Sequence, residues 1–123
     1  MRREFDRIRA QHGIELPDLN IGTAGSESCA PALGRRILDI AQSVPGHTAI
    51  LNGRYTGGYI TRHYGDPASG VHAVQMEMAQ SAYMEEECPW RFVPERAAAA
   101  RAILREQLET ALAWVNRAGT PRV

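Results

Sequence analysis

The sequence contains no lysine, and its fourteen arginines are balanced by fourteen acidic residues. Surfaces that bind nucleic acids or anionic membranes carry an excess of basic side chains, so this neutrality argues against both kinds of partner. Arginine is the basic residue best suited to paired hydrogen bonds with a carboxylate. Individual arginines are therefore worth weighing as contacts for an acidic small molecule.

Cysteine is also scarce. Cys29 and Cys88 lie far apart and form no C-x-x-C motif, so their number excludes a zinc finger and a disulfide framework. Buried free thiols in a reducing compartment are the expected state. The chain lacks an apolar run long enough to span a bilayer, and its charged first residues contain no apolar signal-peptide core. These absences predict a cytoplasmic protein without a membrane partner.

What is present is ordinary globular material, since 44% of the 123 residues are hydrophobic and the length suits one domain. Helical and period-two spacings of apolar residues define the expected elements. The predicted helices cover residues 2–12, 31–44 and 94–117, and the predicted strands cover 47–52, 58–64 and 71–79. Residues 16–31 are predicted as a loop in which Ser28 caps the following helix. The predicted fold class is α/β, with a small mixed sheet of about three strands flanked by helices.

The first two predicted strands form a hairpin across residues 56–58, and its register decides where two arginines point. With a three-residue loop, Asn52 lies opposite Arg62, and Arg54 lies on the same face. With a two-residue loop at 57–58, Arg62 lies on the opposite face from Arg54. The glycines in this turn permit both registers, so the sequence leaves the choice open.

The third predicted strand carries the strongest candidate for chemistry. Because side chains alternate along a strand, Gln75 and Glu77 share one face, while His72 lies on the other face with the methionines. An ionised carboxylate in an apolar strand needs a partner, which makes Glu77 a functional candidate. His63 and His72 together would offer two nitrogens, fewer than a zinc site requires.

Three parts of the sequence resemble a known family: "LPDLNIGT", "LNGRYTGGYITRHYGDPASGVHAVQMEMAQSAYM" and the closing amphipathic helix. They are similar to the C-terminal half of the N-formylglutamate amidohydrolases, also called N-formylglutamate deformylases. The resemblance covers residues 16–117 and makes residues 1–123 a single partial domain. It implies a fold resembling the C-terminal part of a zinc-carboxypeptidase-like hydrolase. It also implies hydrolysis of N-formyl-L-glutamate to formate and L-glutamate in histidine degradation.

The resemblance also implies roles for particular residues. Glu77 corresponds to the general acid/base that activates water and protonates the leaving nitrogen. A dicarboxylate substrate needs charge-assisted hydrogen bonds, which arginines provide. The residues implied for the substrate pocket are Asn52, Arg54, Arg62, His63 and His72.

The sequence departs from the family before "LPDLN", where the family has a metal-ligating "D-x-H-S" strand. Here "MRREFDRIRAQHGIE" stands instead, so we assign no metal ligand and expect zinc or another divalent metal only in the full-length family. Three hypotheses follow: a truncated deformylase that is inactive alone, one half of a split enzyme, or a non-catalytic carboxylate-binding module. A second chain or self-association would complete the sheet, whose outer strands lack neighbours.

Overall fold

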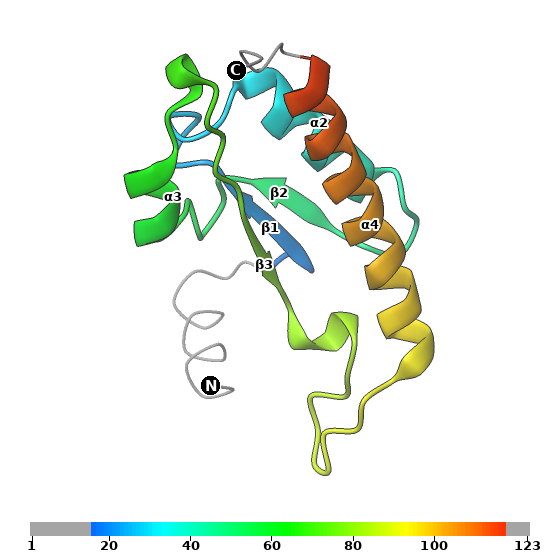
Figure 1. The fold of residues 1–123 in the computed structure, drawn as a ribbon. Coiled ribbons are helices and arrows are strands. Elements are labelled where there is room, and N and C mark those ends of the chain that lie inside the picture. Colours follow the sequence, from blue (N-terminus) through cyan, green and yellow to red (C-terminus); the bar gives the residue numbers. More distant parts are fainter. Residues whose placement is uncertain (1–15, 118–123) are drawn as a thin grey trace.

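The computed structural model describes residues 16–117 and shows a mixed sheet with two long helices (Figure 1). The strands are β1 (Leu19–Gly22), β2 (Ala49–Leu51) and β3 (Gln75–Met78), and the α-helices are α2 (Pro31–Gln42), α3 (Tyr59–Tyr64) and α4 (Pro94–Arg117). Short 3-10 turns cover Pro67–Ser69 and Gln80–Ala82. The helix predicted over 2–12 lies outside the described residues.

The three strands lie in the order β2-β1-β3, with β1 in the centre. Strand β1 pairs in parallel with β2 and antiparallel with β3, so the predicted mixed α/β class is confirmed. All four residues of β1 are buried, as expected for a strand with a neighbour on each side. The central strand therefore sets the position of both others.

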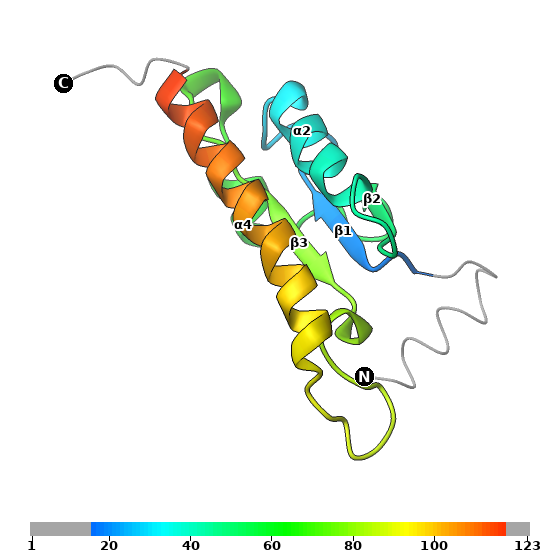
Figure 2. The ribbon, with the colours of Figure 1, turned by 90° about the vertical axis from the view of Figure 1, so that its right-hand side faces the viewer.

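Helices α2 and α4 pack side by side on one face of the sheet (Figure 2). The buried apolar core between helices and sheet consists of Leu19, Ile21, Cys29, Leu33, Ile37, Leu38, Ala41 and Ile103. The two helices are also joined by a buried hydrogen bond, in which Gln107 Nε2 donates to the Ile37 carbonyl at 2.9 Å. Because side chains alternate along β1, Asn20 points to the opposite face of the sheet from Leu19 and Ile21.

The predicted strand over 58–64 is wrong, and with it the hairpin. These residues form α3, whose first turn is closed by a hydrogen bond from the Arg62 N–H to the Gly58 carbonyl at 3.2 Å. The buried Thr61 packs against Gly57, where a Cβ would lie 2.9 Å from its methyl carbon. Gly57 also has φ +124°, which favours glycine. Thr61 thus packs closely against the turn that precedes α3. The segment forms a helix and not the extended strand of a hairpin.

Three other boundaries differ from the prediction. Strand β1 lies inside the predicted loop over 16–31, and the predicted strands over 47–52 and 71–79 shorten to β2 and β3. The chain before β3 bonds to other segments, since the Val71 and Ala73 N–H groups donate to the Asp66 and Ser28 carbonyls. Ser28 does not cap α2: its hydroxyl donates to the Ala73 carbonyl at 2.8 Å. The predicted helices over 31–44 and 94–117 are confirmed as α2 and α4.

Both cysteines are free, but only Cys29 is buried, whereas Cys88 is exposed. Burial raises the pKa of the Cys29 thiol and keeps it protonated. Among residues 16–117, no helix combines the length and apolar character needed to cross a bilayer.

Candidate functional site

The polar face of the sheet, turned away from α2 and α4, carries Glu77. In the antiparallel register Glu77 lies opposite Asn20, and Gln75 lies two residues away on the same face. Gln75 Nε2 donates to Glu77 Oε1 at 2.6 Å, while Gln75 Oε1 accepts the Gly58 N–H at 2.6 Å. Gln75 therefore orients the Glu77 carboxylate and is itself fixed by the start of α3.

The apolar setting expected for Glu77 is wrong, because its side chain is exposed. Met76 and Met78 flank it in sequence but point to the other face, where they pack against the core. Alternation along the strand separates the carboxylate from its apolar neighbours. Glu77 consequently faces solvent with one of its oxygens held by Gln75.

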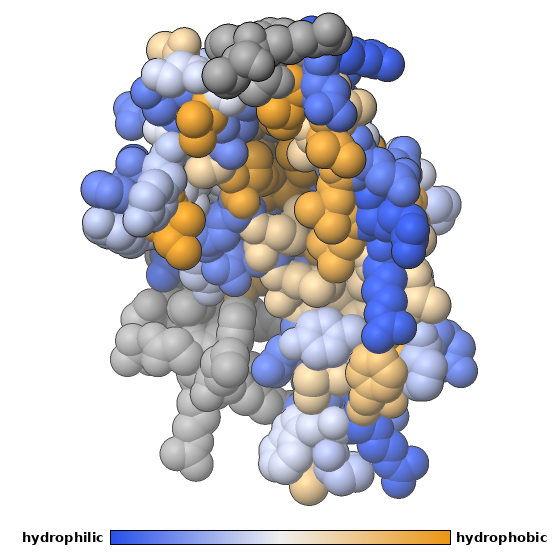
Figure 3. Space-filling view, viewed as in Figure 1, coloured by the Kyte–Doolittle hydropathy of each residue, from blue (hydrophilic) through white to orange (hydrophobic). Residues whose placement is uncertain are grey.

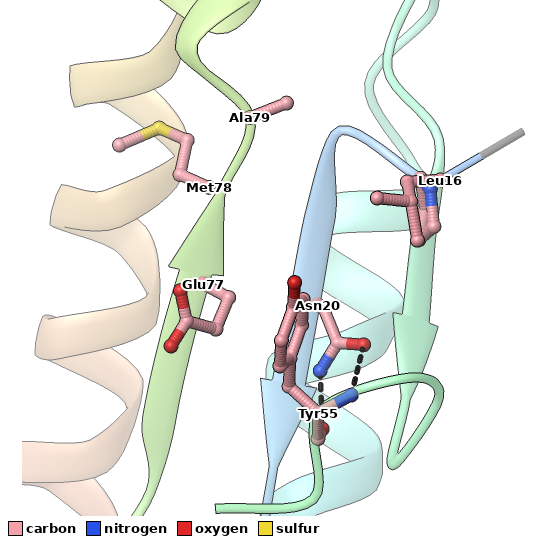
Figure 4. Close-up of a pocket in the computed structure, with 7 residues that line it drawn as sticks. Leu16, Asn20, Tyr55, Glu77, Met78 and Ala79 are labelled. Carbon is pink, nitrogen blue, oxygen red and sulfur yellow. Dashed lines mark hydrogen bonds between the residues drawn. The ribbon is translucent and has the colours of Figure 1, made fainter. Parts of the chain in front are cut away.

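Glu77 borders a small pocket of about 30 Å³ (Figure 4). The pocket is lined by Leu16, Pro17, Asn20, Tyr55, Glu77, Met78 and Ala79. Figure 4 shows Glu77 on one side of this pocket and Asn20 with Tyr55 on the facing side. A space of this size accommodates about one water molecule. The pocket therefore offers a water-sized space beside a carboxylate and is too small for a dicarboxylate.

Asn20 fixes the wall that faces Glu77. Its Nδ2 donates to the Tyr55 carbonyl at 2.6 Å, and its Oδ1 accepts the Tyr55 N–H at 3.3 Å. Asn20 is only 4% exposed, so these bonds satisfy an amide that burial would otherwise destabilise. The sequence interpretation missed Asn20 and Tyr55. The polar residue within the alternating apolar segment "LNIG" was the available signal.

Asn52 joins the two loops that follow β1 and β2. Its Oδ1 accepts the Thr23 N–H at 2.8 Å, and its Nδ2 donates to Thr23 Oγ1 at 2.9 Å. Its backbone has φ +50°, a left-handed conformation that asparagine tolerates better than most residues. The Asn52 amide thus holds the chain at the start of the segment that leads to Arg54.

Arg54 and Arg62 do not share a hairpin, so neither predicted register applies. Both side chains are exposed. Arg62 lies on α3, and its Nη1 donates to the Gly57 carbonyl at 2.8 Å. Arg54 lies in the loop that connects β2 to α3, one residue before Tyr55.

The two candidate histidines lie in different surroundings. His63 is exposed on α3 and stacks on Tyr59, with ring centroids 4.8 Å apart. His72 Nδ1 accepts the Ala30 N–H at 3.1 Å, and its ring meets Trp114 of α4 edge-on at 6.3 Å. His72 therefore contacts the helices that cover the other face of the sheet from Glu77.

Metal ligation has no basis in the described part of the chain. Across residues 16–117, no three side chains of His, Cys, Asp or Glu gather into a group that could hold a metal ion. No metal ligands are therefore assigned within residues 16–117.

Comparisons with known proteins each match most of this chain. The family model described as N-formylglutamate amidohydrolase matches residues 1–84. An N-formylglutamate deformylase of Pseudomonas putida is 41% identical over 133 aligned positions, covering 93% of this chain and 50% of the relative. A second N-formylglutamate deformylase, from Pseudomonas aeruginosa, is 50% identical over 99 positions, covering 80% of this chain and 37% of the relative. The chain thus spans half or less of the curated relatives it matches.

A solved structure supports the fold. The crystal structure of an N-formylglutamate amidohydrolase from Ralstonia eutropha superposes with a TM-score of 0.76 at 24% identity. The match covers 94% of this chain and 40% of that chain. The described elements therefore reproduce a portion of a larger fold.

Proposed function

Because the chain belongs to the N-formylglutamate amidohydrolase family, we propose that it supplies the acid–base side of an active site that hydrolyses N-formyl-L-glutamate. The products are formate and L-glutamate, and the step belongs to histidine degradation in the cytoplasm. The observation that carries the proposal is the Glu77 carboxylate, held by Gln75 beside a water-sized pocket in a chain of this family.

Glu77 acts as the general base and then as the general acid. Its carboxylate accepts a proton from the attacking water, whose oxygen bonds to the formyl carbon. As the carbon–nitrogen bond breaks, Glu77 delivers that proton to the leaving nitrogen of glutamate. Gln75 donates to one carboxylate oxygen and leaves the other oriented toward the reacting groups.

Two exposed arginines bind the substrate carboxylates. Arg54 lies in the loop after β2 and Arg62 lies on α3, and a guanidinium pairs with a carboxylate through two parallel hydrogen bonds. His63 contributes a further contact from α3. Asn52 and His72 hold the surrounding segments through Thr23 and Ala30 and so act as positioning residues.

The chain by itself is proposed to be inactive. The pocket beside Glu77 measures about 30 Å³, too small for N-formylglutamate. The zinc or other divalent metal of the full-length family also has no set of ligands in residues 16–117. We derive no catalytic step through that ion. The substrate cavity is completed by the part of the family fold that this chain does not span.

Formate release from N-formylglutamate tests this proposal. The chain is assayed alone and together with the half of the Pseudomonas putida deformylase that it does not match, both with added zinc. We expect no formate from either polypeptide alone and catalytic release from the mixture. Substrate binding by the mixture without formate release would instead support a carboxylate-binding module. Full activity of the chain alone would contradict the proposal that the other half supplies the metal ligands and completes the substrate cavity.

A further inference from the structure

The peptide group between Gly57 and Gly58, at the start of α3, is held from both sides. Its carbonyl, on Gly57, accepts a hydrogen bond from Arg62 Nη1 at 2.8 Å. Its N–H, on Gly58, donates to Gln75 Oε1 at 2.6 Å. The φ of +124° at Gly57 favours glycine and allows the backbone to turn the two ends of this peptide toward different partners. One planar peptide therefore joins the arginine of α3 to the glutamine of β3.

Gln75 extends this connection to Glu77. Its Nε2 donates to Glu77 Oε1 at 2.6 Å, on the face of the sheet turned away from α2 and α4. The two bonds fix the orientation of the Gln75 amide, because the flipped amide would turn its NH₂ group toward the Gly58 N–H and its oxygen toward the carboxylate. We call these four groups the amide relay: the Arg62 guanidinium, the 57–58 peptide, the Gln75 side-chain amide and the Glu77 carboxylate.

The three hydrogen bonds of the amide relay run in one direction. Each of its two amides accepts at its oxygen from the side of the Arg62 cation and donates from its nitrogen toward the Glu77 carboxylate. Hydrogen bonds that follow one another in this way polarise and strengthen each other. The amide relay therefore links the guanidinium to the carboxylate although no proton moves along it.

The segment that carries the amide relay is fixed in place, whereas its outer end is accessible. The Thr56 carbonyl accepts the Ala24 N–H at 2.6 Å, so the chain before the 57–58 peptide is tied to the loop after β1. In Figure 3, most side chains over α3 are hydrophilic, in contrast to the hydrophobic side chains that gather along α4. Arg62 is exposed, and its bond to Gly57 uses one of the five N–H donors of a guanidinium. A carboxylate needs two of the other four.

We propose that Gln75 and the 57–58 peptide are positioning groups that couple substrate binding at Arg62 to the orientation of Glu77. A substrate carboxylate pairs with the outer N–H groups of Arg62, while the amide relay holds Glu77 Oε1 and leaves Oε2 to face the attacking water. The group that binds the substrate and the group that activates the water are thereby kept in one fixed relation. This inference rests on the proposed function and adds a physical link between its residues on α3 and β3.

Nuclear magnetic resonance of the ¹³C,¹⁵N-labelled chain alone tests the amide relay. We expect a scalar coupling across the hydrogen bond between the Gly58 ¹⁵N and the Gln75 ¹³Cδ. Arg62→Met should shift the resonances of the Gly58 N–H, the Gln75 NH₂ group and the Glu77 carboxylate carbon. Arg101→Met removes an exposed arginine of α4 and should leave all three unshifted. Absence of the coupling, or a Glu77 resonance that does not respond to Arg62→Met, would overturn the proposal.

A second substitution separates the amide relay from a direct electrostatic effect of Arg62. Gln75→Leu interrupts the relay, so in that background Arg62→Met should leave the Glu77 carboxylate carbon unshifted. Gln75→Leu should also speed exchange of the Gly58 amide roughly 2- to 10-fold, the range that one hydrogen bond contributes. Circular dichroism establishes that the variants retain their helices. A Glu77 shift of equal size with and without Gln75 would show that Arg62 acts through space and would overturn the relay.

Kinetics of the enzyme reconstituted with the unmatched half of the Pseudomonas putida deformylase test the positioning role. Gln75→Leu should lower kcat for N-formylglutamate roughly 10- to 100-fold, because a misplaced reacting group is costly. KM should stay nearly unchanged, since the substrate still binds to Arg62. An unchanged kcat in Gln75→Leu would overturn the positioning role, even where Glu77→Gln is inactive. Undiminished activity of Glu77→Gln would instead count against the proposed function, while the resonance shifts would still decide whether the amide relay exists.

Discussion

At the scale of single residues, Asn20 connects the sheet to the candidate site. Its buried amide makes two hydrogen bonds to the backbone of Tyr55, across 35 positions of sequence. The residue therefore determines where the loop after β2 meets the polar face. This link is structural and should be measurable as stability.

We predict that Asn20→Ala lowers the free energy of unfolding by about 1–3 kcal/mol, because the Tyr55 N–H and carbonyl lose their partner. Urea denaturation followed by circular dichroism measures this change. Asn116→Ala, at an exposed position of α4, is the control and should change stability by less than about 0.5 kcal/mol. Equal effects of the two substitutions would contradict the structural role of Asn20.

Individual residues also show how much of the candidate site could be predicted from the sequence. Alternation along one strand was sufficient to place Gln75 and Glu77 on one face, and their 2.6 Å hydrogen bond confirms it. Asn20 and Tyr55 could not be found in this way. Their position depends on the pairing of β1 with β3 and on a loop that returns to the sheet, which no local pattern specifies.

At the scale of elements, residues 56–57 cross the end of β1. This crossing positions the neighbouring Tyr55. A Cβ on Gly22 would lie 2.8 Å from the Thr56 carbonyl carbon and 2.9 Å from the Gly57 nitrogen. Both atoms belong to the backbone, so the contact cannot be relieved by turning a side chain. Gly22 therefore permits the close approach of these two segments.

We predict that Gly22→Ala destabilises the protein by about 1–3 kcal/mol through this overpacking. The matched control is Gly34→Ala in α2, where the nearest atom lies at an ordinary 3.4 Å. Because alanine favours helices, the control should be neutral or stabilising by up to about 1 kcal/mol. Thermal unfolding of both variants distinguishes them. A harmless Gly22→Ala would show that the two backbones do not approach so closely.

Long elements were predictable and short ones were not. Helix α4 covers Pro94–Arg117 as predicted, because the helical spacing of its apolar residues extends over 24 residues and begins at a proline. The six residues of α3 include β-branched and aromatic side chains typical of strands, yet they fold as a helix after Gly58. Strand β1 has four residues within a segment rich in proline and glycine. In both short segments tertiary contacts outweigh the local preference.

At the scale of the whole molecule, the chain forms a core on one side of the sheet and a candidate site on the other. The helices bury one face, whereas Glu77 lies on the opposite face beside an open strand edge. In the described residues the pocket beside Glu77 holds about one water molecule, although the helices and sheet already form a buried core. The proposed activity is accordingly a property of the completed fold.

The rate of formate release by the reconstituted Glu77→Gln variant tests the central claim most directly. Glutamine keeps the oxygen that accepts from Gln75 but cannot take a proton from water. We predict a rate 100- to 10,000-fold lower, the range typical of general acid–base groups, with N-formylglutamate binding retained. Glu109→Gln, at an exposed position of α4, is the matched control and should leave the rate unchanged. A Glu77→Gln enzyme as fast as the unmodified one would contradict the account.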